Sequence, residues 1–155
     1  MAKTAISKTA ISKTAISKYM LIMRNSGSVQ SFEEMDFDAV ITAMGEYNEA
    51  MIEAGVLLAG DGLSDAAQGA VVEFTGEAPI VTDGPYGEAH ELFNGFWTIQ
   101  ASSKEEAVEW AKRAPLTRGN KIEVRRVTDE SDFAGHEDNE YLQKEKEWRA
   151  AEQQA

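Results

Sequence analysis

The sequence contains no cysteine and little positive charge, and each shortage removes a class of function. Without cysteine there is no disulfide framework, no thiol nucleophile and no thiolate metal site. Lys and Arg number 15 against 27 Asp and Glu, which gives a formal net charge of −12. Nucleic acids and anionic membranes bind clustered Lys and Arg, so neither is expected as a direct partner. We expect a cytoplasmic protein.

Long hydrophobic runs are also missing. No stretch approaches the roughly 20 apolar residues that span a bilayer. Lys recurs through the first 18 residues, which is unlike the apolar centre of a signal peptide. Hydrophobic residues nevertheless make up 43% of the 155 residues, enough for the core of one compact domain.

The chain divides into three segments. Residues 1–17 contain a perfect five-residue repeat, Lys-Thr-Ala-Ile-Ser, whose period fits neither a helix nor a strand. We interpret it as a tag-like or disordered arm, with a basic docking arm as the alternative. Residues 18–127 form the folded body. Residues 128–155 are an acidic tail, in which Leu142 and Trp148 indicate either a docked surface helix or a solvated, fraying segment.

The body predicts a β-α-β unit, a hairpin and a second β-α-β unit. Short apolar runs bounded by turn residues indicate strands, and apolar stripes with capping residues indicate helices. The expected strands are 19–23, 56–59, 70–74, 78–82, 95–100 and 121–127. The first expected helix begins at Asp36 or Asp38, or earlier at a capping box of Ser31 and Glu34, and ends at Gly55. The second runs from Ser103 to Pro115. This order predicts a ferredoxin-like α+β fold. Its open sheet face would carry Met, Phe and Trp, so we expect a homodimer that packs sheet against sheet.

The loop that follows residue 82 holds most of the candidate chemistry. Asp83-Gly84-Pro85 predicts a rigid turn, in which the Asp83 side chain either caps the turn or acts on a ligand. His90 lies between two carboxylates, so it is either a general acid or base or a solvent-facing loop residue. Arg24, at the end of the first strand, either binds a carboxylate ligand or forms a salt bridge.

The same loop resembles a known family signature. Asp83-Gly84-Pro85-Tyr86, followed by an acidic stretch and the aromatic strand Gly95-Phe96-Trp97, is similar to the signature of the YCII-related family, often called the DGPF domain. Tyr86 replaces the usual Phe, and His90 stands where Lys is common. The resemblance extends over residues 18–127. It implies a ferredoxin-like dimeric α+β barrel with a cleft beside the sheet.

The resemblance also frames the function. Some members resemble dehalogenating lyases that act on hydroxylated aromatics, and others are associated with bacterial transcription initiation. We therefore expect a dimer that binds a small aromatic or carboxylate molecule in its cleft, with acid–base, lyase-like chemistry left open. The candidate catalytic residues are His90 and Asp83, and the candidate ligand-binding residues are Arg24, Tyr86 and Glu88. The alternatives are a noncatalytic regulatory or interaction module linked to transcription initiation, and a purely structural domain.

No cofactor is expected. The sequence has no Gly-rich phosphate loop that opens a helix and no Gly-x-Ser-x-Gly elbow. His136-Glu137-Asp138 supplies only one imidazole in an acidic tail, which falls short of a closed metal site. We accordingly predict no metal.

Overall fold

The chain forms an α+β structure, as the sequence predicts. The structure is a computed structural model that describes residues 15–24, 36–85 and 92–155. Its main elements are β1 (Ser17–Arg24), α1 (Phe37–Glu53), β2 (Leu57–Gly62), β3 (Ala70–Glu73), β4 (Ile80–Asp83), β5 (Phe93–Ala101), α2 (Lys104–Lys112), β6 (Lys121–Arg126) and α3 (Glu140–Glu152). Both helices and the strands of the expected body are present at the expected places.

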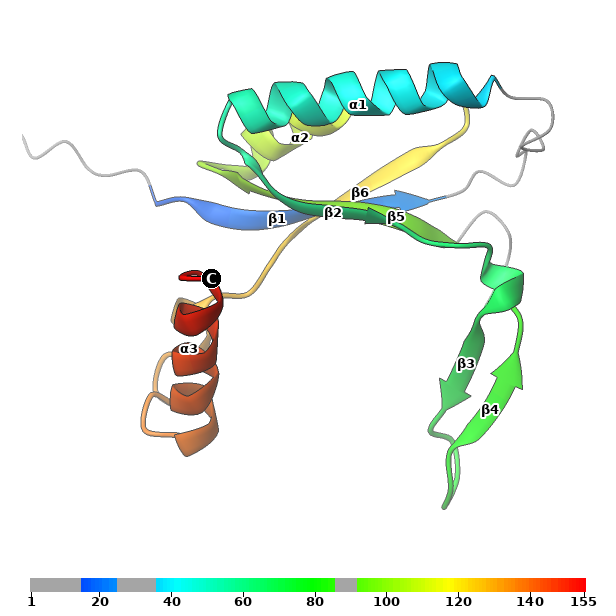
Figure 1. The fold of residues 1–155 in the computed structure, drawn as a ribbon. Helices are drawn as coiled ribbons and strands as arrows, with labels where there is room; N and C mark the ends of the chain where they lie inside the picture. The colour runs from blue at the N-terminus through cyan, green and yellow to red at the C-terminus, as the bar shows by residue number, and fades with distance from the viewer. Residues whose placement is uncertain (1–14, 25–35, 86–91) are drawn as a thin grey trace, which may run out of the picture.

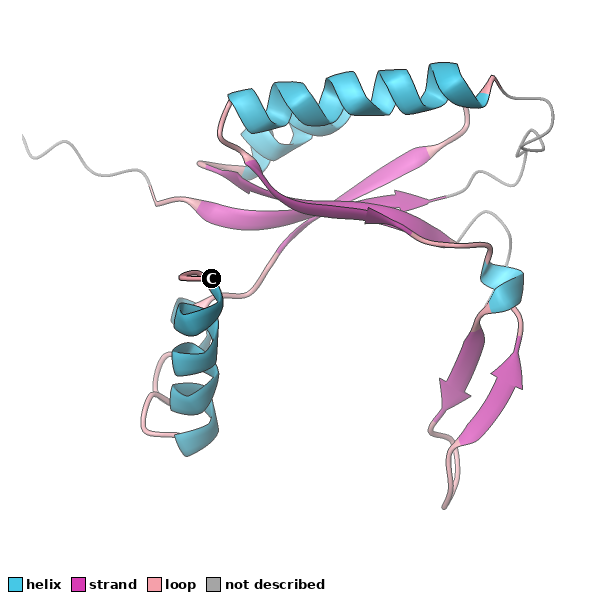
Figure 2. Ribbon diagram, in the orientation of Figure 1, coloured by secondary structure: helices cyan, strands magenta, loops and turns pink. Residues whose placement is uncertain are grey.

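Four strands make the central sheet, in the order β2-β5-β1-β6, and every neighbouring pair is antiparallel. The crossovers through α1 and α2 each pass over one strand, and both helices cover the same face of the sheet (Figures 1 and 2). Within the described residues the sheet is open and closes into no barrel. One face of the sheet is therefore left without a helix.

The predicted hairpin forms a second sheet of its own. Among the described strands, β3 and β4 pair with each other and with no other strand, from Ala70 opposite Asp83 to Glu73 opposite Ile80. The hairpin projects away from the four-stranded sheet, on the side opposite α1 and α2, and α3 projects from the other end on that same side (Figure 1). Two arms thus flank the uncovered face.

Helix α1 begins and ends at residues that satisfy its free backbone groups. The Asp36 side chain accepts a hydrogen bond from the Ala39 amide at 3.1 Å, so Asp36, not Asp38, is the N-cap. Gly55 follows with φ +71°, a left-handed conformation that favours glycine. Ile41 and Ile52 could be expected to widen the buried stripe of α1, but both are exposed. Each is rotated by about 80° or more around the helix from the two buried side chains, Tyr47 and Met51.

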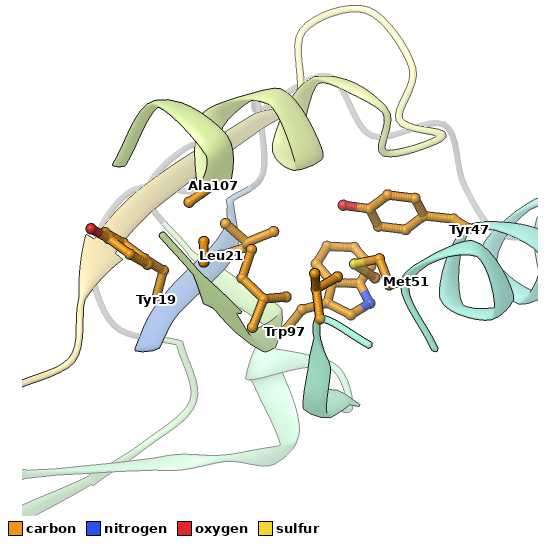
Figure 3. Packing of buried hydrophobic residues seen from close by; sticks show 9 residues of the cluster. Tyr19, Leu21, Tyr47, Met51, Trp97 and Ala107 are labelled. Atoms are coloured by element: carbon orange, nitrogen blue, oxygen red, sulfur yellow. The ribbon is translucent and has the colours of Figure 1, made fainter. Parts of the chain in front are cut away.

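The core lies between the two helices and the covered face of the sheet (Figure 3). Leu21, Met51 and Ile99 are its largest fully buried side chains. The Tyr47 ring meets the Trp97 ring edge-on, with centroids 5.3 Å apart, a favoured geometry for aromatic pairs. Trp97 was expected on the open face. It is buried in the core instead. Successive side chains of a strand point to opposite faces, so Trp97 faces the helices and Phe96 faces away from them.

Two hydrogen bonds fix the aromatic pair. The Tyr47 hydroxyl donates to the Trp110 carbonyl oxygen at 2.8 Å, and the Trp97 Nε1–H donates to Asn48 Oδ1 at 2.9 Å. A buried phenol or indole that lacks such a partner would lose its hydration without compensation. These bonds tie α1 to α2 and to β5.

The buried position of Tyr47 makes fold stability depend on alkaline pH. Burial raises the pKa of Tyr47 from 10 to about 12, although the positive charge of Arg113 opposes the rise. The folded state then holds the proton more tightly than the unfolded state, so stability is complete below pH 10 and falls as pH rises towards 12. We expect ionisation of this phenol to lower the free energy of unfolding by on the order of 2 kcal/mol over that range. Urea unfolding of the wild type and of Tyr47→Phe measures the free energy of unfolding at about pH 9.5, below the ordinary pKa of tyrosine, and at about pH 12. The free energy should fall less in the variant between these two pH values. Equal falls in the two proteins would contradict the assignment.

The register assigns side chains to the uncovered face. Residues directly opposite each other in adjacent strands share a face. Tyr19 and Leu21 lie in the core, so the residues between them point the other way. The uncovered face carries Met20, Ile22 and Arg24 of β1, Phe96 and Thr98 of β5, and Lys121, Glu123 and Arg125 of β6. Met20 and Phe96 match the expectation of apolar side chains there.

Candidate functional site

An open cleft of about 910 Å³ lies where β1 and β6 meet the base of the hairpin. Its walls come from the ends of these strands, from residues 63–66 after β2, from the base of β3 and β4, and from Leu92 and Phe93 at the start of β5. Segments far apart in the sequence therefore converge on one concave surface. Such a surface is the default place to look for a small-molecule site.

Arg24 lies in this cleft and is held by a neighbouring carboxylate. Its Nε and Nη2 donate to Glu123 Oε2 at 2.9 and 2.8 Å. The pair is possible because β1 and β6 are adjacent, with Ile22 opposite Glu123. The salt bridge expected as one alternative for Arg24 is thus present. With about a third of each side chain exposed, the pair contributes little to stability, and its main effect is to orient the guanidinium.

Lys121 is the second cation of the cleft, and the sequence analysis missed it. It lines the cleft opposite Arg24 in the β1–β6 register. In the described part of the chain its side chain makes no hydrogen bond or ion pair and is exposed. The alternation of residues in this strand could have indicated its position. Ile122 and Val124 face the core, which places Lys121 on the opposite face.

The rest of the cleft is largely apolar. Leu63, Val71, Leu92 and Phe93 contribute side chains to its wall. The Leu63 amide donates to the Asn94 carbonyl at 2.8 Å, which holds the segment after β2 against the start of β5. The Phe93 ring also lies 6.1 Å from the Phe96 ring, centroid to centroid. The lining also holds two carboxylates, of which Glu123 pairs with Arg24 and Asp65 accepts from the Ala67 amide. An apolar wall beside Lys121 suits a ligand with an apolar body and one anionic group.

The turn after β4 brings its backbone, but not the Asp83 side chain, to the cleft wall. Gly84 has φ +99°, and its amide donates to the Gly69 carbonyl at 2.9 Å. Gly84 and Pro85 line the cleft, whereas Asp83 is an exposed neighbour paired with Ala70. None of the hydrogen bonds in the described ranges involves the Asp83 side chain, so the expected side-chain cap of the turn is not observed there. The role of Asp83 stays a prediction.

Three predicted site residues, Tyr86, Glu88 and His90, lie outside the described residues. The two residues that bracket this segment, Pro85 and Leu92, both line the cleft. The chain therefore leaves the cleft wall at one of them and returns to it at the other. The acid–base role of His90 and the ligand contacts of Tyr86 and Glu88 remain predictions.

Metal and membrane features were searched over the same described ranges. There, no group of three or more His, Asp or Glu side chains comes together in a way that could hold a metal ion. No helix in that part of the chain has both the length and the apolar character needed to cross a bilayer.

Comparison with models of known protein families gives a match over most of the chain. Residues 17–131 match the family model of the YCII-related domain. The match begins at the first residue of β1 and extends past the end of β6, so it includes every strand that forms the cleft. It ends before α3. No curated protein matches the chain.

Proposed function

The chain belongs to the YCII-related domain family, and we propose that it is a homodimer that binds a small aromatic carboxylate in the cleft between β1, β6 and the hairpin base. The observation that carries the proposal is Lys121, a cation without a partner in the described chain that faces a cleft with an apolar wall. A carboxylate would satisfy this ammonium group by a charge-assisted hydrogen bond. The aromatic body of the ligand would lie against Leu63 and Phe93.

Arg24 supports the same ligand in a second way. Its guanidinium has several N–H donors in a planar fork, and Glu123 Oε2 accepts from two of the nitrogens. We propose that Glu123 orients the guanidinium and that the positive charge of Arg24 attracts the anionic group of the ligand. The cleft would then hold an anion between an oriented Arg and a more adaptable Lys.

Acid–base chemistry at this site would come from the segment between Pro85 and Leu92. We propose that His90 acts as the general acid or base, because imidazole titrates near neutral pH, and that Asp83 beside the cleft assists it. Tyr86 and Glu88 would contact the ligand. Support comes from the two flanking residues, which both line the cleft. The resulting chemistry would be lyase-like, acting on the bound aromatic compound.

The dimer and the ferredoxin-like arrangement form part of the proposal. The order β2-β5-β1-β6, with each helix passing over one strand, supports a ferredoxin-like body. This body would span residues 18–127, between an arm at 1–17 and a tail at 128–155. On its uncovered face, Met20 and Phe96 form a partly exposed apolar strip beside Ile22, which is already buried within the chain. A second copy packed sheet against sheet would remove this strip from water and complete an α+β barrel.

Benzoate is the probe for the cleft. We expect the Lys121→Ala variant to bind benzoate about 10-fold to 100-fold more weakly than the wild type, because hydrogen bonds to charged groups contribute about 1.5–3 kcal/mol. Isothermal titration calorimetry measures the affinity. Lys112→Ala is the control, since Lys112 lies on α2 and pairs with Glu109. Benzamide, which has the same ring but no charge, should bind weakly to all three proteins. Equal affinity for benzoate and benzamide would contradict the assignment.

A further inference from the structure

The hairpin and α3 are the two elements that the body leaves without a packing partner. Each makes only slight contact with any other helix or strand of the described chain. They extend from opposite ends of the sheet on its uncovered side (Figure 1). An isolated two-stranded hairpin and a short isolated helix are both marginally stable in water. Both arms would gain stability from a partner that covers them.

Each arm exposes large apolar side chains. On the hairpin, Val72 lies directly opposite Val81, so the two share one face, and Phe74 beyond them is 81% exposed. On α3, Tyr141 and Trp148 are seven residues apart and therefore lie on one side of the helix, and Trp148 is 58% exposed. The two arms therefore present apolar strips of similar character.

Charge decides which arm would meet which. The sequence has no Lys or Arg between Arg24 and Lys104, so the charged residues of the hairpin, Glu73, Glu77 and Asp83, are all acidic. A contact between two hairpins would place acid against acid, which is unfavourable. Helix α3 carries three cations, Lys144, Lys146 and Arg149, among four acids, so of the two arms it is the one that can offer cations to a hairpin.

The cations of α3 are free to change partners. They pair within the chain with Glu140, Glu130 and Glu145. Each of these pairs is largely exposed, and exposed pairs are worth only about 0–1 kcal/mol. Exchange for the acids of a hairpin would therefore cost little.

From these observations we infer that α3 of one copy packs against the β3–β4 hairpin of a second copy, and that this contact occurs twice in the dimer. The inference rests on the dimer proposed above. In a two-fold dimer, a contact from one region to another is always repeated in reverse. Suppose that the two uncovered faces stack so that the α3 end of one sheet lies over the hairpin end of the other. Each α3 then meets the hairpin of the partner copy. Because the family match ends at residue 131, this clamp would be an addition to the family body.

The absence of cysteine provides a direct test. In the double variant Val72→Cys/Glu145→Cys, one thiol lies on the apolar face of the hairpin and the other lies between Tyr141 and Trp148 on the same side of α3. The two arms of one chain are at opposite ends of the sheet (Figure 1), so a disulfide between them must join two copies. Mild oxidation should convert most of the double variant into a covalent dimer, several-fold more than either single variant.

Three results would overturn the clamp, and they separate its failure from that of the dimer. If Glu145→Cys alone cross-links as well as the double variant, α3 lies beside the partner's α3 instead. If the double variant does not cross-link although sedimentation shows a dimer, the dimer stands and the clamp fails. If sedimentation shows a monomer, both fail. The pair Ile52→Cys/Glu145→Cys measures the background, because Ile52 is exposed on α1, on the far side of the sheet.

Discussion

Replacing Leu21 with alanine is expected to lower the free energy of unfolding by about 2 to 5 kcal/mol. Leu21 is 0% exposed and lies in β1 between the two central pairings, opposite Trp97 on one side and Val124 on the other. Strands on both sides fix the backbone, so the walls of the new cavity have little freedom to collapse. The loss would be a large share of a typical stability of about 5–15 kcal/mol.

The matched control is Leu58→Ala, which deletes the same atoms from another strand. Leu58 is 44% exposed on the edge strand β2, and we expect the change to cost less than about 1 kcal/mol. Urea unfolding followed by circular dichroism measures both variants, at equal protein concentration because dimerisation affects apparent stability. Similar losses for the two variants would mean that the core is not centred on β1 as described.

Replacing Met20 with lysine is expected to weaken the dimer by about 30-fold to several thousandfold. Met20 lies near the middle of the uncovered face, opposite Thr98 and Arg125. In a dimer packed through this face, the new ammonium group would be buried without a partner and close to other cations. An unpaired buried charge of this kind costs about 2–5 kcal/mol at an interface, which is a change in Kd of about 30-fold to several thousandfold.

Sedimentation equilibrium measures this effect, with Ile41→Lys as the control. Ile41 is exposed on the outer side of α1, so the same added charge should leave the association unchanged. Circular dichroism checks that both variants are folded. A Met20→Lys protein that dimerises as tightly as the wild type would show that the uncovered face is not the interface.

The order of the elements could be predicted because local signals agree with the final packing. Asp36 and Gly55 bound α1 as an N-cap and a left-handed C-terminal residue. Ser103 also caps α2, accepting from the Glu106 amide. The Glu106 carboxylate, however, accepts from the Ser102 amide rather than from the capping residue itself. Capping residues thus predicted where helices begin, but not the detail of their bonds.

The assignment of faces was less predictable, because it depends on register and not on composition. The apolar run at 95–100 indicated a strand, but it did not indicate whether Phe96 or Trp97 faces the helices. Only pairing with β1 places Trp97 in the core and Phe96 on the uncovered face. The position of Lys121 beside Arg24 depends on the same long-range pairing.

For the tail, the sequence predicted a helix but not whether that helix packs against the body. Leu142 and Trp148 predicted a helix there, and α3 spans Glu140–Glu152. Whether it docks could not be read from its pattern, since Trp148 is an apolar residue among many charged ones. Among the residues that the structure describes, α3 makes only slight contact with any other helix or strand, and Trp148 stays largely exposed. Its packing partner, in our account, lies on another copy.

Native mass spectrometry of the gently purified protein, with and without added benzoate, measures the subunit number and the ligand uptake together. We expect a species of twice the chain mass that takes up two benzoate molecules, and no uptake of benzamide under the same conditions. We also expect that Lys121→Ala remains a dimer but loses the uptake. A monomer that retains no small molecule, with or without benzoate, would contradict both the dimer and the cleft as a binding site.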